Sequence, residues 1–348
     1  MAQSNFRACA SARIASLLFA AIFCLVAVHP ASAERLESPL ELMYAPGNTI
    51  VAGPLVEINP AGRIVLERKD VLGGKDRPPD KIDVRVPKEI LGTLKIGDPY
   101  IAAYSLYRRD PRKAVGMALN PDGAVILAST GIEPALFRDT PAARAIVKAG
   151  RSEHSRESRR LVDLLLDALE GSDAQLQNLA AGEFAFEPET AERLRDADRA
   201  RLEKVALDSK TPVLPRMSLL DASSRNPKEI GDWWKAAALQ IVTTTPIDGY
   251  SDRATDPTSL VLMSFEVLDR YSVKVPVEAL KRWVWSPTPP LVERVCVMLR
   301  REAPGEERST IQLALADPKL PEATRKFLSD HLRRLDVIDE RARKEGSG

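Results

Sequence analysis

The spacing of apolar residues along the chain changes near residue 140. Before that point, short apolar and β-branched runs alternate with turn residues, and Val84 and Val86 alternate with Asp83 and Arg85 as in a half-buried strand. The runs predict strands at 49–58, 63–69, 82–86, 99–107, 114–119 and 124–128. Strands this short, packed into about 90 residues, predict a small antiparallel β-barrel or sandwich.

After Pro141 the apolar residues recur with the 3.6-residue period of a helix, as Leu161, Leu165 and Leu169 illustrate. Many of these segments begin with Pro, which suits the first helical position. The predicted helices span 141–148, 157–170, 174–183, 188–208, 212–224, 227–244, 257–271, 276–285, 290–301, 306–316 and 321–344. The sequence therefore predicts a two-domain β + α protein, with a β-rich domain at 34–140 and a helical domain at 141–345.

A turn pattern recurs within the helical half. It combines an Asp with Pro four residues later, Arg four after that and an apolar residue three further on; the copies are Asp208, Pro212, Arg216, Leu219 and Asp317, Pro321, Arg325, Leu328, with a looser one at Ser286, Pro290, Arg294, Val297. We expect the Asp to cap the following helix, the Pro to start it, and the Arg to reach back to the Asp.

Helical hairpins with such a turn resemble HEAT-type α-helical repeats, and the resemblance covers roughly the last 150 residues. It implies a binding, scaffolding or accessory role and no chemistry. The alternative is an irregular helical domain in which the recurrence of Pro at the helix starts is a coincidence. In the β half, the order of strand, turn, strand, a loop at 71–74, and a segment at 94–100 leading into another strand resembles OB-like, netrin-module-like barrels.

The first residues have the pattern of a secretory signal. Arg7 and Arg13 precede an apolar run at 14–28, and small residues lead to a cleavage site after Ala33. We therefore expect a signal peptide at 1–33 and a periplasmic or secreted mature protein with no integral membrane segment. The alternative is a retained N-terminal anchor.

The net charge and the cysteine content of the chain argue against some kinds of function and of stabilisation. Removing the signal leaves 48 basic and 49 acidic residues, a balance that argues against nucleic acid as a partner. Cys296 is then the one remaining cysteine, so no intramolecular disulfide is expected. Its helical spacing with Val292, Val295 and Leu299 predicts a buried structural thiol.

Enzyme signatures are sparse. The mature chain has two histidines, His154 and His331, which we expect at the surface, and it lacks the common nucleophile, phosphate-loop and zinc-protease motifs. We expect no catalytic residues, no metal and no cofactor. Paired carboxylates at the domain junction remain open as the catalytic groups of a cell-envelope glycan or polymer hydrolase.

Two features suggest binding surfaces. Tyr104, Tyr107, Arg108 and Arg109 combine aromatic rings with cations, a combination that OB-like barrels use for polymers. The alternative is that Tyr100 and Tyr104 face the core while the basic residues form a solvated hairpin tip.

The second feature is Trp285, which points about 100° away from the apolar stripe of its helix and is a candidate exposed anchor or repeat-to-repeat contact. The leading expectation is a non-catalytic binding or scaffold protein of the cell envelope, holding a protein or peptide on the helical array. The alternatives are the hydrolase and a glycan-binding module that uses exposed Tyr104 and Tyr107.

Overall fold

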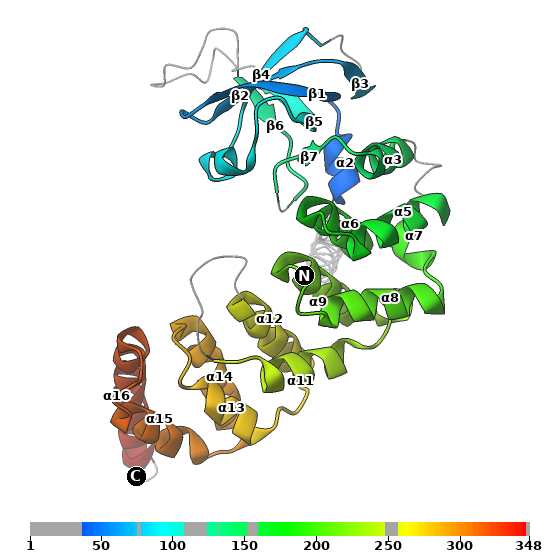
Figure 1. Cartoon of the computed structure of the whole chain (residues 1–348). Coiled ribbons are helices and arrows are strands. Elements are labelled where there is room, and N and C mark those ends of the chain that lie inside the picture. Colours follow the sequence, from blue (N-terminus) through cyan, green and yellow to red (C-terminus); the bar gives the residue numbers. More distant parts are fainter. Residues whose placement is uncertain are drawn as a thin grey trace, which may run out of the picture. The chain divides into compact units, whose positions relative to one another are not determined.

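The computed structural model describes residues 37–74, 78–107, 124–131, 133–151, 159–247 and 257–345. All described elements belong to one compact unit, Glu37–Gly348, in which a β domain precedes a helical region (Figure 1). The predicted signal at 1–33, the predicted strand at 114–119, His154, Arg108 and Arg109 lie outside the described residues. None of the described helices combines the length and the apolar character needed to cross a bilayer.

The described part of the chain contains seven strands. They are β1 (Asn48–Asn59), β2 (Arg63–Glu67), β3 (Asp70–Gly73), β4 (Lys81–Arg85), β5 (Pro99–Tyr107), β6 (Ala124–Leu127) and β7 (Leu136–Arg138), with the 3₁₀ helix η1 (Lys88–Thr93) between β4 and β5. The strands predicted around 49–58, 63–69, 82–86, 99–107 and 124–128 are confirmed. The segment predicted as a loop at 71–74 instead contains β3, and β7 was not predicted.

Five of the strands close into a ring. β1 pairs with β2, β2 with β4, β4 with β6, β6 with β5, and β5 returns to β1. The pairings are antiparallel except that between β4 and β6, which joins Arg85 to Ile126. This pairing agrees with the small, mainly antiparallel β domain expected from the sequence. At its corner, only glycine fits position 53, because a Cβ there would lie 1.9 Å from the carbonyl oxygen of Glu67.

Side chains on the two faces of the central strands pack in two different hydrophobic cores. On β1, Val51 and Leu55 point into the barrel, whereas Ile50 and Ala52 belong to the core that the helices share. Side chains alternate between faces along a strand, so one β segment serves both cores. The change from strand to helix between β7 and α3 (Pro141–Gly150) therefore does not separate two independent cores.

The described part of the helical region is a series of five helix pairs. The first and second members are α5 and α6, α8 and α9, α11 and α12, α13 and α14, and α15 and α16. The second members α6, α9, α12, α14 and α16 contact one another in that order, so each pair packs on the next. Stacked helix pairs are the arrangement expected of a HEAT-like array.

The helix bounds agree closely with the sequence pattern. The helices are α2 (Pro39–Met43), α3 (Pro141–Gly150), α5 (Arg159–Glu170), α6 (Ala174–Phe186), α7 (Pro188–Glu192), α8 (Asp196–Leu207), α9 (Val213–Arg225), α10 (Pro227–Ile230), α11 (Trp234–Thr244), α12 (Pro257–Arg270), α13 (Val277–Trp283), α14 (Pro289–Glu302), α15 (Glu306–Ala316) and α16 (Glu322–Glu345). Two predicted helices are each broken in two, one of them at Gly231, whose φ of 112° a right-handed helix cannot contain.

The recurring turn pattern joins the two helices of a pair, but its Arg has a different partner from the one predicted. Asp208 Oδ1 accepts a hydrogen bond from Lys210 N at 2.9 Å, which stabilises the turn itself. Arg216 Nε donates to the carbonyl oxygen of Ala206, 2.9 Å away in the last turn of α8. The expected contact to the Asp is therefore wrong for Arg216, because the helix C-terminus offers unsatisfied carbonyls at the end of its dipole. In the second copy, Arg325 does reach back to Asp317, but to its backbone carbonyl oxygen.

The second copy repeats these contacts. Asp317 Oδ1 accepts from Lys319 N at 2.9 Å, and Arg325 donates to the carbonyl oxygens of Leu315 and Asp317, each at 2.6 Å. In the looser copy, Ser286 replaces Asp, and Arg294 is paired with Asp269 of the neighbouring helix pair at 2.8 Å. The pattern is thus a device for ending one helix and starting the next.

The short helix α2 fits into the helical core through two glycines. A Cβ on Gly150 of α3 would lie 2.7 Å from Leu40, and one on Gly182 of α6 would lie 2.6 Å from Pro39. In the same place, Leu40 N donates to Glu183 Oε1 at 2.5 Å and so satisfies a free N–H at the start of α2. Glycine at these positions lets α2 approach both helices closely.

Replacing Gly182 with Ala tests this close packing. Ala favours a helix interior by about 1 kcal/mol over Gly, but the added methyl meets the rigid ring of Pro39. We expect Gly182→Ala to destabilise the protein by about 1–3 kcal/mol, seen as a lower Tm. Gly92→Ala is the matched control, because no atom lies within 4 Å of a Cβ there. Equal Tm values for the two variants would contradict the packing described.

Candidate functional site

A groove of about 390 Å³ lies between α13 and α15. Its lining residues are Glu278, Lys281, Arg282, Trp285, Glu306, Ser309, Thr310 and Leu313. Leu313 is 65% exposed, and Trp285 is half-buried against the core. A large apolar side chain exposed beside an aromatic one in a hollow is the usual composition of an anchor site for another molecule.

Trp285 is held in the groove by the next helix pair. Its Nε1–H donates to Asp317 Oδ2 at 3.0 Å, so the Asp of the second turn pattern fixes the indole as well as the turn. Trp283, two residues earlier, is instead fully buried and donates to the carbonyl oxygen of Val242 at 2.7 Å. Trp285 therefore makes the contact between repeats that its position in the sequence suggested, while part of its ring lines the groove.

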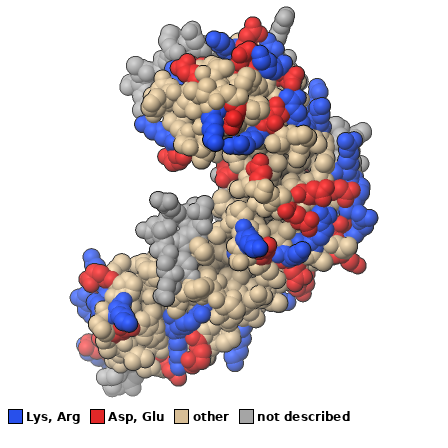
Figure 2. Space-filling model, viewed as in Figure 1, with Lys and Arg blue, Asp and Glu red and all other residues tan. Residues whose placement is uncertain are grey.

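The charges around the groove are mostly paired. Lys281 Nζ lies 3.3 Å from Glu278 and 3.1 Å from Glu306, and the hydrogen bond to Glu306 raises the pKa of Lys281. Arg282 donates to the carbonyl oxygens of Val242 and Thr245, at 2.9 and 3.0 Å. On the face shown in Figure 2, basic and acidic side chains are likewise interspersed. The groove thus favours an apolar contact over capture of a highly charged ligand.

A second hollow, of about 510 Å³, lies beside the first copy of the turn pattern. Asp208, Lys210 and Pro212 form one side, and Glu170 and Lys204 contribute to the rest. Its rim is charged, and its lining includes no aromatic residue. The hollow therefore lacks the aromatic anchor that distinguishes the groove at Trp285.

The predicted aromatic surface of the barrel is only partly described. Tyr104 is 4% exposed and lies in the barrel core with Tyr100. The two rings therefore face the core, as the alternative interpretation of this segment predicts. Tyr107 ends β5, but its side chain, like Arg108 and Arg109, lies outside the described residues. A glycan-binding surface that needs Tyr104 exposed is therefore contradicted.

Two buried carboxylates lie four residues apart near the junction of the two halves, Glu183 in α6 and Glu187 directly after the end of α6. Glu183 is fully buried and accepts the hydrogen bond from Leu40 N at the start of α2, and Glu187 is also buried. A carboxylate that caps a buried helix end is not in contact with a polymer substrate. These two residues therefore give the hydrolase alternative no accessible acid–base pair.

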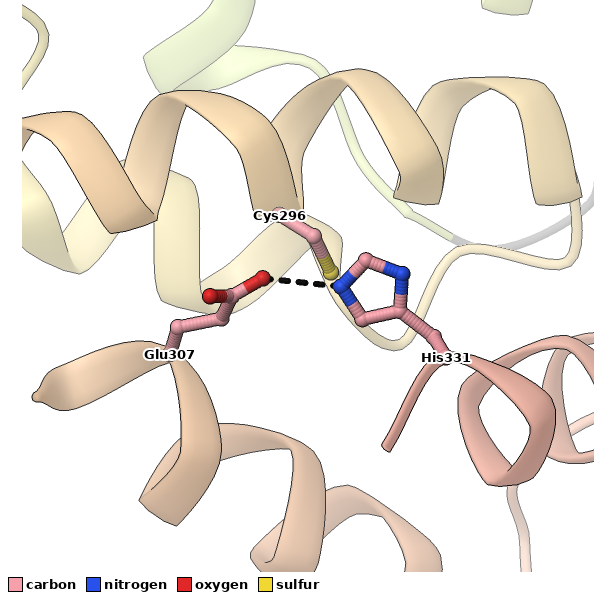
Figure 3. A group of neighbouring side chains, drawn as sticks. All are labelled: Cys296, Glu307 and His331. Atoms are coloured by element: carbon pink, nitrogen blue, oxygen red, sulfur yellow. Dashed lines mark hydrogen bonds and ion pairs between the residues drawn. The ribbon is translucent and has the colours of Figure 1, made fainter. Parts of the chain in front are cut away.

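Cys296, Glu307 and His331 converge in the helical region, although they come from α14, α15 and α16 (Figure 3). His331 Nε2 lies 2.8 Å from Glu307 Oε1, and all three donor atoms lie within 4.8 Å of one another. His331 is 8% exposed, so the expectation that it lies at the surface was wrong. Its ring stacks on that of Phe327, four residues earlier in α16, with the centroids 5.7 Å apart.

The electrostatics of this cluster do not suit a nucleophilic cysteine. Burial raises the pKa of Cys296 to about 12, so the sulfur is a thiol at neutral pH. Burial also acts to raise the pKa of Glu307, but hydrogen bonds from His331 and Arg300 outweigh it and hold that pKa below its usual value. In a catalytic triad the two ring nitrogens face different partners, whereas here Nε2 is the nitrogen that contacts Glu307 and lies near the sulfur.

Comparison with known proteins does not assign a function to either site. No protein-family model, no curated protein and no solved structure matches the chain.

The sequence contains a signal for the buried position of His331. Thr324, Leu328, His331 and Leu335 follow helical spacing along one side of α16, and the first three are buried. The convergence with Cys296 and Glu307 had no comparable signal, because it depends on how α14 and α16 pack. Sequence spacing therefore indicated the contact that Trp285 makes between repeats and gave no sign of the cluster.

The reactivity of Cys296 tests its described environment. We expect an alkylating reagent to leave Cys296 of the native chain unmodified at neutral pH and to modify it rapidly in denaturant, because the thiol is fully buried and protonated. Mass spectrometry after a timed reaction gives the modified fraction. Rapid stoichiometric alkylation of the native protein would contradict the burial of this side chain.

Proposed function

We propose that the chain is a non-catalytic binding or scaffold protein of the cell envelope that holds a partner protein or peptide on its helical array. The observation that carries the proposal is the groove between α13 and α15, with Trp285 in its lining and Leu313 exposed beside it. Arrays of helix pairs generally serve as surfaces for other proteins.

The energetics of the groove support a peptide-like ligand. Full burial of a Leu side chain contributes about 1.5–3 kcal/mol, and Leu313 has most of its surface still exposed. Trp285 is already oriented by its hydrogen bond to Asp317, so little further ordering of the indole is required on binding. Lys281 is bridged between two glutamates, which places polar groups at the rim, as in typical interfaces.

Export to the periplasm or beyond is part of the proposal. The signal pattern at 1–33 supports it, and the state of Cys296 agrees with it. This residue is the one cysteine that remains after the predicted cleavage, and it is fully buried. A chain of this kind presents no exposed thiol to an oxidising compartment.

Substitution of Leu313 tests the groove without disturbing the core. We expect the mature chain to capture a defined partner from an envelope extract, and Leu313→Glu to reduce that capture at least tenfold, because a carboxylate cannot be buried unpaired in an apolar contact. The matched control is Ile96→Glu, since Ile96 is 63% exposed on the barrel. Capture is quantified by mass spectrometry against both variants.

Two results would contradict the proposal. One is the absence of any partner retained by the wild-type chain. The other is a partner whose capture is unaffected by Leu313→Glu, or equally reduced by Ile96→Glu. The full mature chain is required for this experiment, because residues 141–348 alone would lose the β residues that complete the shared core.

A further inference from the structure

We infer that Cys296, Glu307 and His331 form a binding site for a borderline or soft metal ion, with Zn²⁺ as the divalent ion that best matches the donors. A thiolate sulfur, an imidazole nitrogen and a carboxylate oxygen are the three ligand types that zinc takes from proteins. The three side chains come from three helices and point toward a common centre (Figure 3). This inference is independent of the groove at Trp285.

The spacing of the donor atoms is close to what an ion requires. The three atoms lie within 4.8 Å of one another. Zinc bonds of about 2.0–2.3 Å place two tetrahedral ligands roughly 3.3–3.8 Å apart. Side-chain movements of about 1 Å therefore bring the donors to bonding distance, without any rearrangement of the helices.

Arg300 donates to both oxygens of the Glu307 carboxylate. Its Nε lies 2.7 Å from Oε2, and its Nη2 lies 2.9 Å from Oε1, the oxygen that is also directed at His331. Hydrogen bonds of the kind made to Oε2 commonly orient ligating carboxylates around a metal. The same Nη2 lies 3.3 Å from His331 Nε2, so an ion would replace Nη2 at both atoms; the Arg300 side chain is 48% exposed, and its Nε can keep the contact to Oε2.

Binding exchanges protons for the metal. The thiol proton of Cys296 leaves as the sulfur becomes a thiolate ligand, and the proton on Nε2 of His331 gives way to the ion, so the neutral ring carries its proton on Nδ1. No oxidation or reduction is involved. The thiolate and carboxylate together balance the two charges of Zn²⁺, which makes a buried position for the ion tolerable.

The position of the cluster suggests what a bound ion would do to the structure. α14 belongs to one helix pair and α15 and α16 to the next, and α16 contacts both α14 and α15. An ion ligated from α14, α15 and α16 would therefore join these two neighbouring pairs.

The test uses the mature chain, freed of metal with a chelator. Co²⁺ is the optical probe, because a thiolate ligand gives it an intense near-ultraviolet charge-transfer band, and Zn²⁺ is used for calorimetry and thermal melting. We expect one equivalent of each ion to bind, a higher Tm with Zn²⁺, and loss of the Co²⁺ band in Cys296→Ser. We also expect His331→Gln to weaken Zn²⁺ binding at least tenfold, with His154→Gln as the matched control.

If a variant fails to fold, the Co²⁺ titration of the wild-type mature chain is sufficient as a test. Cys296 is the one thiol of that chain, so a thiolate charge-transfer band can arise only from this residue. A charge-transfer band at one equivalent supports the site. Absence of that band, or Zn²⁺ binding that is unchanged in folded Cys296→Ser, would overturn it.

Discussion

The close packing of α2 against α3 and α6 is the constraint on which the rest of the structure depends. This five-residue helix leads directly into β1, and its Leu40 and Met43 are fully buried with residues of both the β strands and the helices. Gly150 and Gly182 have no side chain that would collide with α2, and Glu183 accepts a hydrogen bond from the backbone N–H of Leu40, which would otherwise be unsatisfied. One face of β1 also packs in the helical core, so the barrel and the first helix pair share a single hydrophobic core.

The rest of the array is built on arginines that bridge neighbouring helices. Arg216 and Arg325 bind carbonyl oxygens at the end of the preceding helix, and Arg282 does the same for α11 across a repeat boundary. A planar guanidinium holds five N–H donors in a fixed arrangement, so it can bind two carbonyl oxygens at once in a defined geometry. Where the turn carries Ser286, Arg294 instead joins its helix to Asp269 of the preceding pair. The same residue type thus closes turns and joins repeats.

Local patterns predicted the elements well, and tertiary contacts explain what they missed. Pro starts and the 3.6-residue period located the helices from 141 onward, because both signals are local. α2 was missed because it has five residues and little periodicity, and β7 because three residues form a strand only when β5 is beside them.

The candidate site residues also differ in whether neighbouring residues in the sequence or tertiary packing determine their surroundings. Trp285 was recognisable because its direction departs from the apolar stripe of its own helix, a property of a few neighbouring residues. Tyr104 was ambiguous, since a strand pattern does not say which face is enclosed. Cys296 and His331 are 35 positions apart in the sequence, and their contact is created by the packing of α14 on α16.

The central claim, that the groove between α13 and α15 is where a partner is held, is tested most directly by crosslinking in the cell that makes the protein. A photoreactive side chain at position 313 lies in the groove, and one at position 96 lies on the barrel. The account predicts a discrete crosslinked product from position 313 and none of the same mass from position 96. Illumination that yields no product from position 313, or the same product from both positions, would contradict it.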